Sequence, residues 1–552
     1  MSFFDDASLA FLPSSGAGKD GKAYSIKPTT GAGDFTFSRG SNLSATRVGP
    51  TGLIEKGREN LLLQSNQFDT TWFNASTTET GGQSGYDGLS GAWKIDLTGT
   101  GGYIAQAISN ANVNTISVYA KAGTLNWIRL RVGISPSNSR YFDLENGVIG
   151  LSGTATIDAK IESVGSGWYR CSMTTNISFG RVYFYPAAGD GDVTASSGNI
   201  YIQDAQLEIG LAATDYIESG ATTGKAGLLE DEPRFDYSGG ATCPSLLLEP
   251  SRTNILRQTE YFNSSSWTND AGTTLTTNAA ISPDGSQNAT RFESPLPSKG
   301  LFTYGAVNNQ TISIYIKAGN TDNIGKSVNL YTTTINQSFV LTDEWQRISV
   351  SGSVSNLFAL YPSSGISDLN VFIWGAQAEA GSYPTSYIPN HSGTGSVTRG
   401  KDVATILNQS GVIGQTEGTI FFDAYFDETD KINFSISDYT SSNYISIETT
   451  SVNQVIGVVR QGGSTQVTIS TSAGFFAEGD RLKCAIAYNA NDFAFYINGT
   501  QIGTDSSGSV PACDDIRFAR YNGALAAAQK VNKTLLFDTR LSNADLTTLT
   551  TI

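Results

Sequence analysis

The sequence contains a single histidine, His391, and this scarcity excludes much familiar catalytic and metal chemistry. A serine or cysteine nucleophile activated by histidine would require His391 itself, and a zinc site built from several histidines cannot form. His391 follows Pro389 and Asn390 and precedes Ser-Gly-Thr-Gly, a composition typical of a linker. We therefore expect a solvent-exposed linker residue here.

Cysteine is scarce as well, with four residues and no Cys-x-x-Cys pair. This spacing excludes cysteine metal clusters and thioredoxin-like redox motifs. Cys484 lies on the apolar side of an alternating segment, which favours a small buried side chain. A disulfide between Cys484 and Cys513 stays an open alternative, because sequence alone does not establish a pairing.

Charge is sparse and predominantly negative: charged residues make up 15% of the chain, the formal net charge is −15 and the pI is about 4.6. Nucleic acids and anionic membranes recruit basic surfaces, so neither partner is expected. No apolar run is long enough to span a bilayer, so we expect no membrane insertion. The N-terminus lacks the basic region of a signal peptide, so we expect a cytoplasmic product without one.

The apolar residues that are present alternate with polar ones almost everywhere, as in 128–132 and 493–497, and glycine-rich turns separate the alternating segments. This pattern predicts half-buried strands and an all-β fold of tandem antiparallel β-sandwiches. The pair Asn498-Gly499 predicts a tight hairpin between two strands. The one helical pattern lies at 541–549, with Ser542 or Asn543 as its cap.

The chain contains an internal repeat, because many anchor residues recur in the same order. The spacing between partners shrinks along the chain, which places extra length in the first copy between Lys121 and Trp168 and again after it. We infer two homologous modules, 60–218 and 254–390. The matched pairs are Glu55/Glu249, Arg58/Arg252, Asn60/Asn254, Phe68/Phe262, Trp72/Trp267, Tyr119/Tyr315, Trp168/Trp345, Gln206/Gln377 and Tyr216/Tyr387.

These residues also carry resemblances to known families. The residues that carry the first resemblance are Asn60-Leu-Leu with Phe68 and Trp72, and the segments 376–381, 384–389 and 397–399. Through them, the two modules resemble jelly-roll carbohydrate-binding modules of bacteriophage structural proteins. Residues 496–499 and 539–546 resemble the concanavalin A-like, or laminin G-like, sandwich. The opening, 24–29 and 37–55, is similar to phage virion proteins of the fibre or decoration type.

The resemblances imply a non-enzymatic virion component, exposed on the virion surface, that adheres to host or environmental glycans such as bacterial surface polysaccharide. Head or tail location is not specified. Low charge density and exposed strand edges favour a homo-oligomer. The expected boundaries are an N-terminal segment that docks onto other virion proteins (1–59), the first jelly roll (60–218), a linker (219–253), the second jelly roll (254–390), a linker (391–402) and a concanavalin A-like domain (403–552).

Candidate glycan-binding residues follow from strand alternation, because a sheet can present rings and polar groups on its non-core face. In the first module this face would hold Trp127, Arg129, Arg131, Arg181, Tyr183 and Tyr185, a set suited to an acidic or neutral polysaccharide. The second module lacks the set, and its candidate is Trp374, which aligns with Gln203. The alternative is that such rings pack against a loop or a neighbouring subunit. The recurring tryptophans at 72, 267, 168 and 345 are expected in the cores.

The remaining candidates are carboxylates. Asp190 and Asp192 lie in a Gly-Asp-Gly-Asp turn that could hold a structural calcium ion, although a solvated turn is the simpler interpretation. An acid pair as in glycosidases would be the only catalytic chemistry left, and no supported pair is found, so no catalytic residue and no cofactor are assigned. A structural spacer without glycan binding, and a polysaccharide-degrading accessory protein, stay as alternatives.

Overall fold

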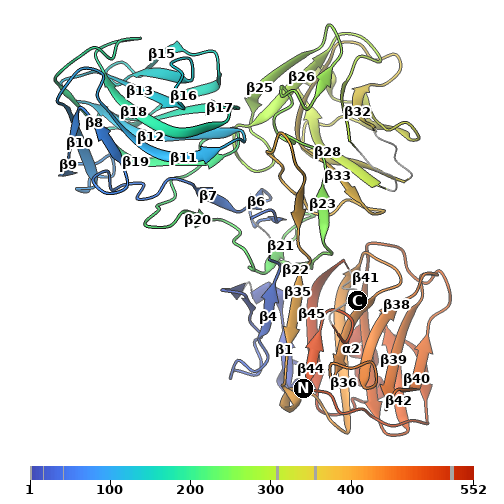
Figure 1. Cartoon of the computed structure of the whole chain (residues 1–552). Coiled ribbons are helices and arrows are strands. Elements are labelled where there is room, and N and C mark those ends of the chain that lie inside the picture. Colours follow the sequence, from blue (N-terminus) through green and yellow to red (C-terminus); the bar gives the residue numbers. More distant parts are fainter. Residues whose placement is uncertain are drawn as a thin grey trace. The chain divides into compact units, whose positions relative to one another are not determined.

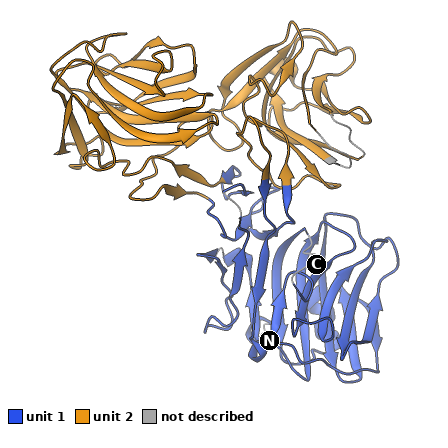
Figure 2. Cartoon of the chain, viewed as in Figure 1, with its two compact units in different colours: residues 1–55, 228–252, 398–552 blue, residues 56–227, 253–397 orange. Residues whose placement is uncertain are grey.

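The computed structural model describes residues 3–15, 18–40, 43–305, 310–352, 357–522 and 528–551, and nearly all of their regular structure is β-strand. The all-β prediction is therefore confirmed. The chain forms two compact units, one of residues 1–55, 228–252 and 398–552 and the other of residues 56–227 and 253–397 (Figure 2). No helix in these ranges is long and apolar enough to cross a membrane.

The first module is a two-sheet sandwich (Figure 1). Its first sheet has the order β16 (Thr156–Gly165), β17 (Trp168–Thr175), β12 (Asn114–Ala122), β19 (Asn199–Ile209), β10 (Ala92–Leu97) and β9 (Thr77–Gln83). The second has the order β15 (Val148–Ser152), β14 (Ser139–Asp143), β13 (Trp127–Val132), β18 (Phe179–Ala187), β11 (Tyr103–Asn110) and β8 (Phe73–Ala75). Apolar side chains from the inner faces of both sheets form one core.

The second module repeats this architecture. One sheet has the order β25 (Thr274–Ala280), β26 (Ala289–Ser294), β33 (Leu369–Ala380), β28 (Gln310–Ala318) and β31 (Gln346–Gly352). The other has the order β24 (Thr268–Asn269), β27 (Leu301–Tyr304), β32 (Leu357–Pro362), β29 (Ser327–Tyr331) and β30 (Asn336–Val340), and a short 3-10 helix, η2 (Thr321–Asn323), follows β28. Read in sequence order, the strands match those of the first module, which adds β15 and β16. Both added strands lie between Lys121 and Trp168, where the sequence predicted the extra length.

Two buried asparagines show why the repeat motif recurs. The Asn60 amide donates to the carbonyls of Ala205 and Ile217, and its oxygen accepts from the N–H groups of Leu62 and Leu207. Asn254 makes the same four hydrogen bonds at the equivalent place in the second module. Each side chain therefore satisfies four backbone groups that would otherwise be buried without a partner.

The first unit is a larger sandwich. One sheet has the order β21 (Arg234–Asp236), β22 (Ser245–Leu248), β45 (Gln529–Phe537), β36 (Glu417–Phe426), β41 (Asp480–Asn489), β42 (Asp492–Ile497) and β43 (Thr500–Asp505), and β1 (Leu9–Phe11) also pairs with β45. The other has the order β2 (Gly18–Lys19), β3 (Lys22–Ala23), β4 (Phe35–Ser38), β35 (Val403–Ile406), β44 (Asp515–Arg517), β37 (Ile432–Ser437), β38 (Tyr444–Thr449), β39 (Val455–Gln461) and β40 (Ser464–Ser470).

Short elements complete the described ranges. Three two-stranded ladders join β5 (Thr46–Val48) to β6 (Ile54–Lys56), β7 (Arg58–Asn60) to β20 (Gly224–Ala226), and β23 (Arg252–Asn254) to β34 (Val397–Arg399). The helical elements of the first unit are α1 (Phe3–Asp6), η1 (Pro13–Ser15), η3 (Ser410–Val412) and α2 (Asn543–Thr550). The predicted C-terminal helix is thus confirmed, and the Ser542 side chain caps it by accepting from the Asp545 N–H. The predicted hairpin is also confirmed, with positive φ at Asn498 and Gly499.

The N-terminal segment does not match the expected boundary at residue 59. Its strand β4 pairs with β35, and Leu9, Phe11 and Phe35 are buried in the core of the C-terminal sandwich. The expected linker 219–253 likewise supplies β21 and β22 to a sheet of that sandwich. The reason is physical: these short segments cannot bury their apolar residues alone, so they complete the sheets of a distant part of the chain.

Buried ion pairs hold the three segments of this unit together. Arg234 contacts Asp402 and also lies 2.6 Å from Glu249, Arg399 lies 2.7 Å from Glu249, and Arg39 lies 3.3 Å from Asp402. All five side chains are almost completely buried. We call these residues the arginine cluster. Because it takes residues from 39, 234–249 and 399–402, it forms only when all three segments are in place.

The structure corrects the expectation for His391 and confirms the one for Cys484. His391 is not a solvent-exposed linker residue, because its side chain is only 12% exposed and its Nε2 lies 3.7 Å from the Glu260 carboxylate; burial lowers its pKa. Cys484 and Cys513 are both buried free thiols, and burial raises the pKa of each. Cys484 is thus the small buried side chain that its alternating segment favoured.

Candidate functional site

Strands β11, β13 and β18 are neighbours in one sheet of the first module (Figure 1). They carry a group of cationic and aromatic residues. Ile128 and Leu130 of β13 lie in the core, so alternation turns their neighbours to the opposite face. There Arg129 is paired with Tyr185, and Arg131 with Tyr183. We define the Arg–Tyr face as Tyr103, Arg129, Arg131, Arg181, Tyr183 and Tyr185.

The guanidinium groups lie over the tyrosine rings. The Arg131 guanidinium carbon is 4.0 Å from the Tyr183 ring centre and 4.9 Å from that of Tyr185. Arg129 lies 5.3 Å from the Tyr185 ring, and Arg181 lies 5.9 Å from the Tyr183 ring. These distances are within the range of cation–π attraction, so the rings hold the cations in place.

Burial divides the face into a base and a surface. Tyr183 and Tyr185 are each 5% exposed and Arg129 is 7% exposed, whereas Arg131, Arg181 and Tyr103 are partly exposed. Burial raises the pKa of Tyr185 to about 12, even though the two neighbouring arginines oppose the shift. The pKa of Arg129 is lowered by burial, with Arg131 as a further contribution in the same direction. A ligand would therefore touch the half-exposed arginines and Tyr103, with the buried tyrosines as support.

The arginines of this face have few acceptors. Arg129 donates from Nη2 to the Pro136 carbonyl. Within the described ranges, the side chains of Arg131 and Arg181 form no hydrogen bond or ion pair with the protein, and the Nε of Arg131 is buried without an acceptor. Guanidinium groups present five N–H donors each, so most of this donor capacity is unused.

Trp127 lies at the rim of the face and not on an open platform. It is partly buried, and it covers Gly150 of β15 so closely that a side chain there would collide with the indole and with the Asp190 carboxylate. Asp190 accepts from the Leu151 N–H at 2.7 Å, and Asp192 accepts from the N–H and hydroxyl of Thr194. The two hydrogen bonds from Thr194 lower the pKa of Asp192.

The proposed calcium turn offers little to a metal ion. Asp192 accepts hydrogen bonds within its own turn, whereas Asp190 accepts from the backbone of strand β15. No group of three or more His, Cys, Asp or Glu side chains suited to a metal lies together in the part of the chain that the structure describes. Asp192 thus orders its own turn, and Asp190 connects the turn to strand β15.

The prediction for Trp374 is wrong, because this side chain is completely buried. Its ring packs 4.6 Å from that of Tyr387 and 5.5 Å from that of Tyr315, and the Lys56 ammonium lies 5.7 Å from it. It cannot present a face to a ligand. Among the recurring tryptophans, Trp72, Trp168 and Trp267 are buried as predicted, whereas Trp345 is partly exposed.

The face that corresponds to the Arg–Tyr face in the second module was missed by the sequence reasoning. Strand pairing places Asn329 opposite Tyr361, and Tyr331 opposite Ala359. Asn329 and Tyr331 therefore stand where the first module has Arg129 and Arg131. The aromatic residues there are Phe302, Tyr304, Tyr331 and Tyr361. Alternation along 327–331 and 301–304 was the signal that could have found them.

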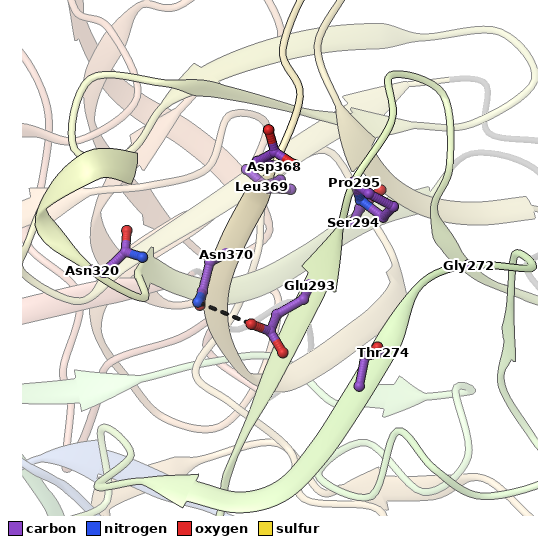
Figure 3. A pocket seen from close by; sticks show the side chains of 9 residues that line it. All are labelled: Gly272, Thr274, Glu293, Ser294, Pro295, Asn320, Asp368, Leu369 and Asn370. Carbon is purple, nitrogen blue, oxygen red and sulfur yellow. Dashed lines mark hydrogen bonds between the residues drawn. The ribbon is translucent and has the colours of Figure 1, made fainter.

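A hollow of about 430 Å³ lies elsewhere in the second module (Figure 3). Its walls come from β25, β26, β33 and adjoining loops, and they are mainly polar. The Glu293 carboxylate accepts from the Asn370 amide at 3.2 Å within it. No aromatic side chain lines it, so it lacks a stacking surface for a sugar.

Two neighbouring acids, Asp427 and Glu428, directly follow β36. Glu428 accepts from the Ala528 N–H at 2.9 Å and lies 3.6 Å from Arg252. The neighbouring Asp427 is largely buried, and this burial raises its pKa to about 6. The Glu428 carboxylate is thus held at the end of β36 by a backbone N–H group and an arginine.

Comparisons with known proteins find no matching family and no matching curated protein. Similar solved structures include the CBM40 of the Ruminococcus gnavus IT-sialidase bound to α2,3-sialyllactose (14% identity; 26% of this chain and 86% of that chain; TM-score 0.23). They also include the CBM22-1–CBM22-2 tandem of Paenibacillus barcinonensis Xyn10C (12%; 59% and 98%; 0.20) and mouse laminin α1 LG4-5 (11%; 55% and 94%; 0.21). These scores assign neither ligand nor activity to this chain, and the fold rests on its own strand order.

Proposed function

We propose that this chain is a non-catalytic structural component of a bacteriophage particle that adheres to glycans through the Arg–Tyr face. The observation that carries the proposal is the row of half-exposed arginines and Tyr103 on one sheet face, supported by buried tyrosine rings. Sugars present C–H groups that pack on rings and hydroxyls that accept hydrogen bonds. Arg131 and Arg181 have unused donors at the surface, and Tyr103 offers a ring beside them.

The position on the particle is part of the same proposal. We place the protein at the virion surface, as a homo-oligomer in contact with other virion proteins, and its glycan is a bacterial surface polysaccharide. The resemblance of residues 24–55 to phage fibre and decoration proteins motivates this placement. Since residues 1–55 belong to the first unit, we assign docking to that unit and adhesion to the first module.

A structural spacer is the second candidate, and one observation favours it. Tyr183 and Tyr185 are almost fully covered by side chains of their own module, so the face is already packed without a ligand. In a spacer, Tyr103 and the exposed arginines would contact a neighbouring subunit and no glycan.

The test uses the full chain on an array of bacterial surface glycans. We expect binding by the wild type and at least tenfold weaker binding by Tyr103→Ala, because the partly exposed ring would be lost. Tyr304→Ala, an exposed aromatic residue on the second module, is the matched control and should bind as the wild type does. Unchanged melting temperatures would establish that the folds are intact. Absence of any binding by the folded wild type would overturn the adhesion proposal in favour of the spacer.

A further inference from the structure

The Arg–Tyr face concentrates positive charge that the protein itself does not neutralise. Arg131 and Arg181 both approach the ring of Tyr183, at 4.0 Å and 5.9 Å from its centre, and Arg129 lies two residues before Arg131 on the same strand. Guanidinium groups that gather around the same rings carry like charges, which repel one another. Placing three guanidinium groups together therefore costs free energy, which a negative partner would recover.

The chain does not lack acids that could pair with these arginines. It has 50 Asp and Glu against 35 Lys and Arg, and elsewhere in the same unit Lys94 pairs with Asp96 at 2.9 Å and Arg291 with Glu293 at 3.5 Å. Within the described ranges, no ion pair involves an arginine of the Arg–Tyr face.

Three carboxylates do lie near one edge of the face, and one of them, Asp143, is paired with Trp127 and accepts hydrogen bonds from Glu145 and Asn146. Asp190 and Asp192 act on Tyr141, whose pKa they help to raise after the larger effect of burial. Asp190 already accepts from the Leu151 N–H of β15 and Asp192 from the Thr194 N–H, and neither forms an ion pair with Arg129, which is the arginine beside Tyr141. The surface around Arg131 and Arg181 stays cationic in a strongly acidic protein.

We propose that the ligand of the Arg–Tyr face is an anionic glycan, and that Arg131 and Arg181 bind its carboxylate, sulfate or phosphate groups. This inference rests on the proposed function and narrows it to one charge class. Guanidinium groups match such oxyanions through paired N–H donors, and the Tyr183 ring packs against the Arg131 guanidinium at 4.0 Å. Tyr103 and the exposed Phe73 then offer rings to the C–H faces of the same sugar chain.

The second module provides an internal comparison. Asn329 and Tyr331 replace Arg129 and Arg131 at the same register, and Leu357 stands at the alignment position of Arg181. Two modules of one fold therefore differ in the charge of one face. Charge selection is accordingly a property of the first module's side chains and not of the shared sandwich.

The experiment measures binding of the full chain to two matched pairs of polymers. Polygalacturonate and its fully methyl-esterified form differ in the carboxylate, and dextran sulfate and dextran differ in the sulfate. We expect at least tenfold tighter binding to a charged member, and a steep loss of affinity between about 50 mM and about 500 mM NaCl. The pair that responds identifies the anionic group.

Substitutions in the Arg–Tyr face test whether this face causes the tighter binding of charged polymers. Arg131→Gln with Arg181→Gln should weaken binding to the charged polymer at least tenfold, because charged hydrogen bonds would be lost. Arg291→Gln removes a partly exposed arginine of the second module and should change nothing. If the charged and uncharged polymers bound equally tightly, and added salt did not weaken that binding, this inference would be overturned and the proposed function would stand. No binding to either member or to any arrayed glycan would overturn the proposed function as well.

Discussion

The arginine cluster yields the sharpest test of the first unit. Asp402 is completely buried, accepts from Arg39 and Arg234, and also accepts the Glu249 N–H at 2.9 Å. Asp402→Asn keeps the shape but leaves three buried arginines with the single carboxylate of Glu249. Breaking a buried ion pair costs about 3–5 kcal/mol, because the remaining charge stays desolvated. We expect the free energy of unfolding of the first unit to fall by this amount.

The assay can separate the two units. All seven tryptophans, at positions 72, 93, 127, 168, 267, 345 and 374, lie in the second unit, so tryptophan fluorescence follows that unit alone. Hydrogen exchange of peptides that contain β1 and β4 follows the first. A loss of about 4 kcal/mol corresponds to exchange about 10³-fold faster in those peptides. The fluorescence transition in guanidinium should not move.

A matched control uses the same substitution on the surface of the same unit. Asp492 is 57% exposed and lies 2.9 Å from Arg540, and such exposed pairs contribute at most about 1 kcal/mol. Asp492→Asn should therefore leave exchange in β1 and β4 nearly unchanged. If Asp402→Asn gave the same small effect, the cluster would not hold the N-terminal strands in place, and our account of the discontinuous unit would be refuted.

Three further predictions concern the modules and the hairpin. Asn60→Ala and Asn254→Ala should each destabilise the protein by about 3–5 kcal/mol in denaturant titrations, because each leaves four backbone groups unpaired; losses below about 1 kcal/mol would contradict this. Burial raises the pKa of Asp204 to about 6, so the folded first module binds the proton more tightly, and its stability should fall as pH rises from about 4 to above 6. Asp204→Asn should abolish that slope in pH-dependent melting. Gly499→Val, at φ +78°, should lower the melting temperature, whereas the same change at the extended Gly180 should not.

Local pattern predicted much of this molecule. Alternation identified the strands, and repeated anchors identified two modules whose strand order agrees. The same alternation placed Arg129, Arg131, Tyr183 and Tyr185 on one sheet face, because a strand turns successive side chains to opposite sides. These are properties of neighbouring residues, so the sequence contains them directly.

Long-range contacts explain what the sequence did not predict. The Gly-rich context of His391 indicated exposure, but Glu260, far away in the chain, lies against it. Trp374 was the glycan-binding candidate of the second module, but Tyr387 and Lys56 pack against it. Composition around a residue does not report which distant side chain packs on it.

The sequence by itself determined the all-β class, the paired modules and the chemistry available to the Arg–Tyr face, because each depends on periodicity and residue type over short spans. Only the tertiary structure decided that residues 1–55 and 228–252 complete the C-terminal sandwich, and that the arginines lie over tyrosine rings without a carboxylate partner. Both outcomes depend on which strands pair across hundreds of residues. Such pairing is selected by the total apolar surface buried and the charges satisfied in the whole fold, which no local segment encodes.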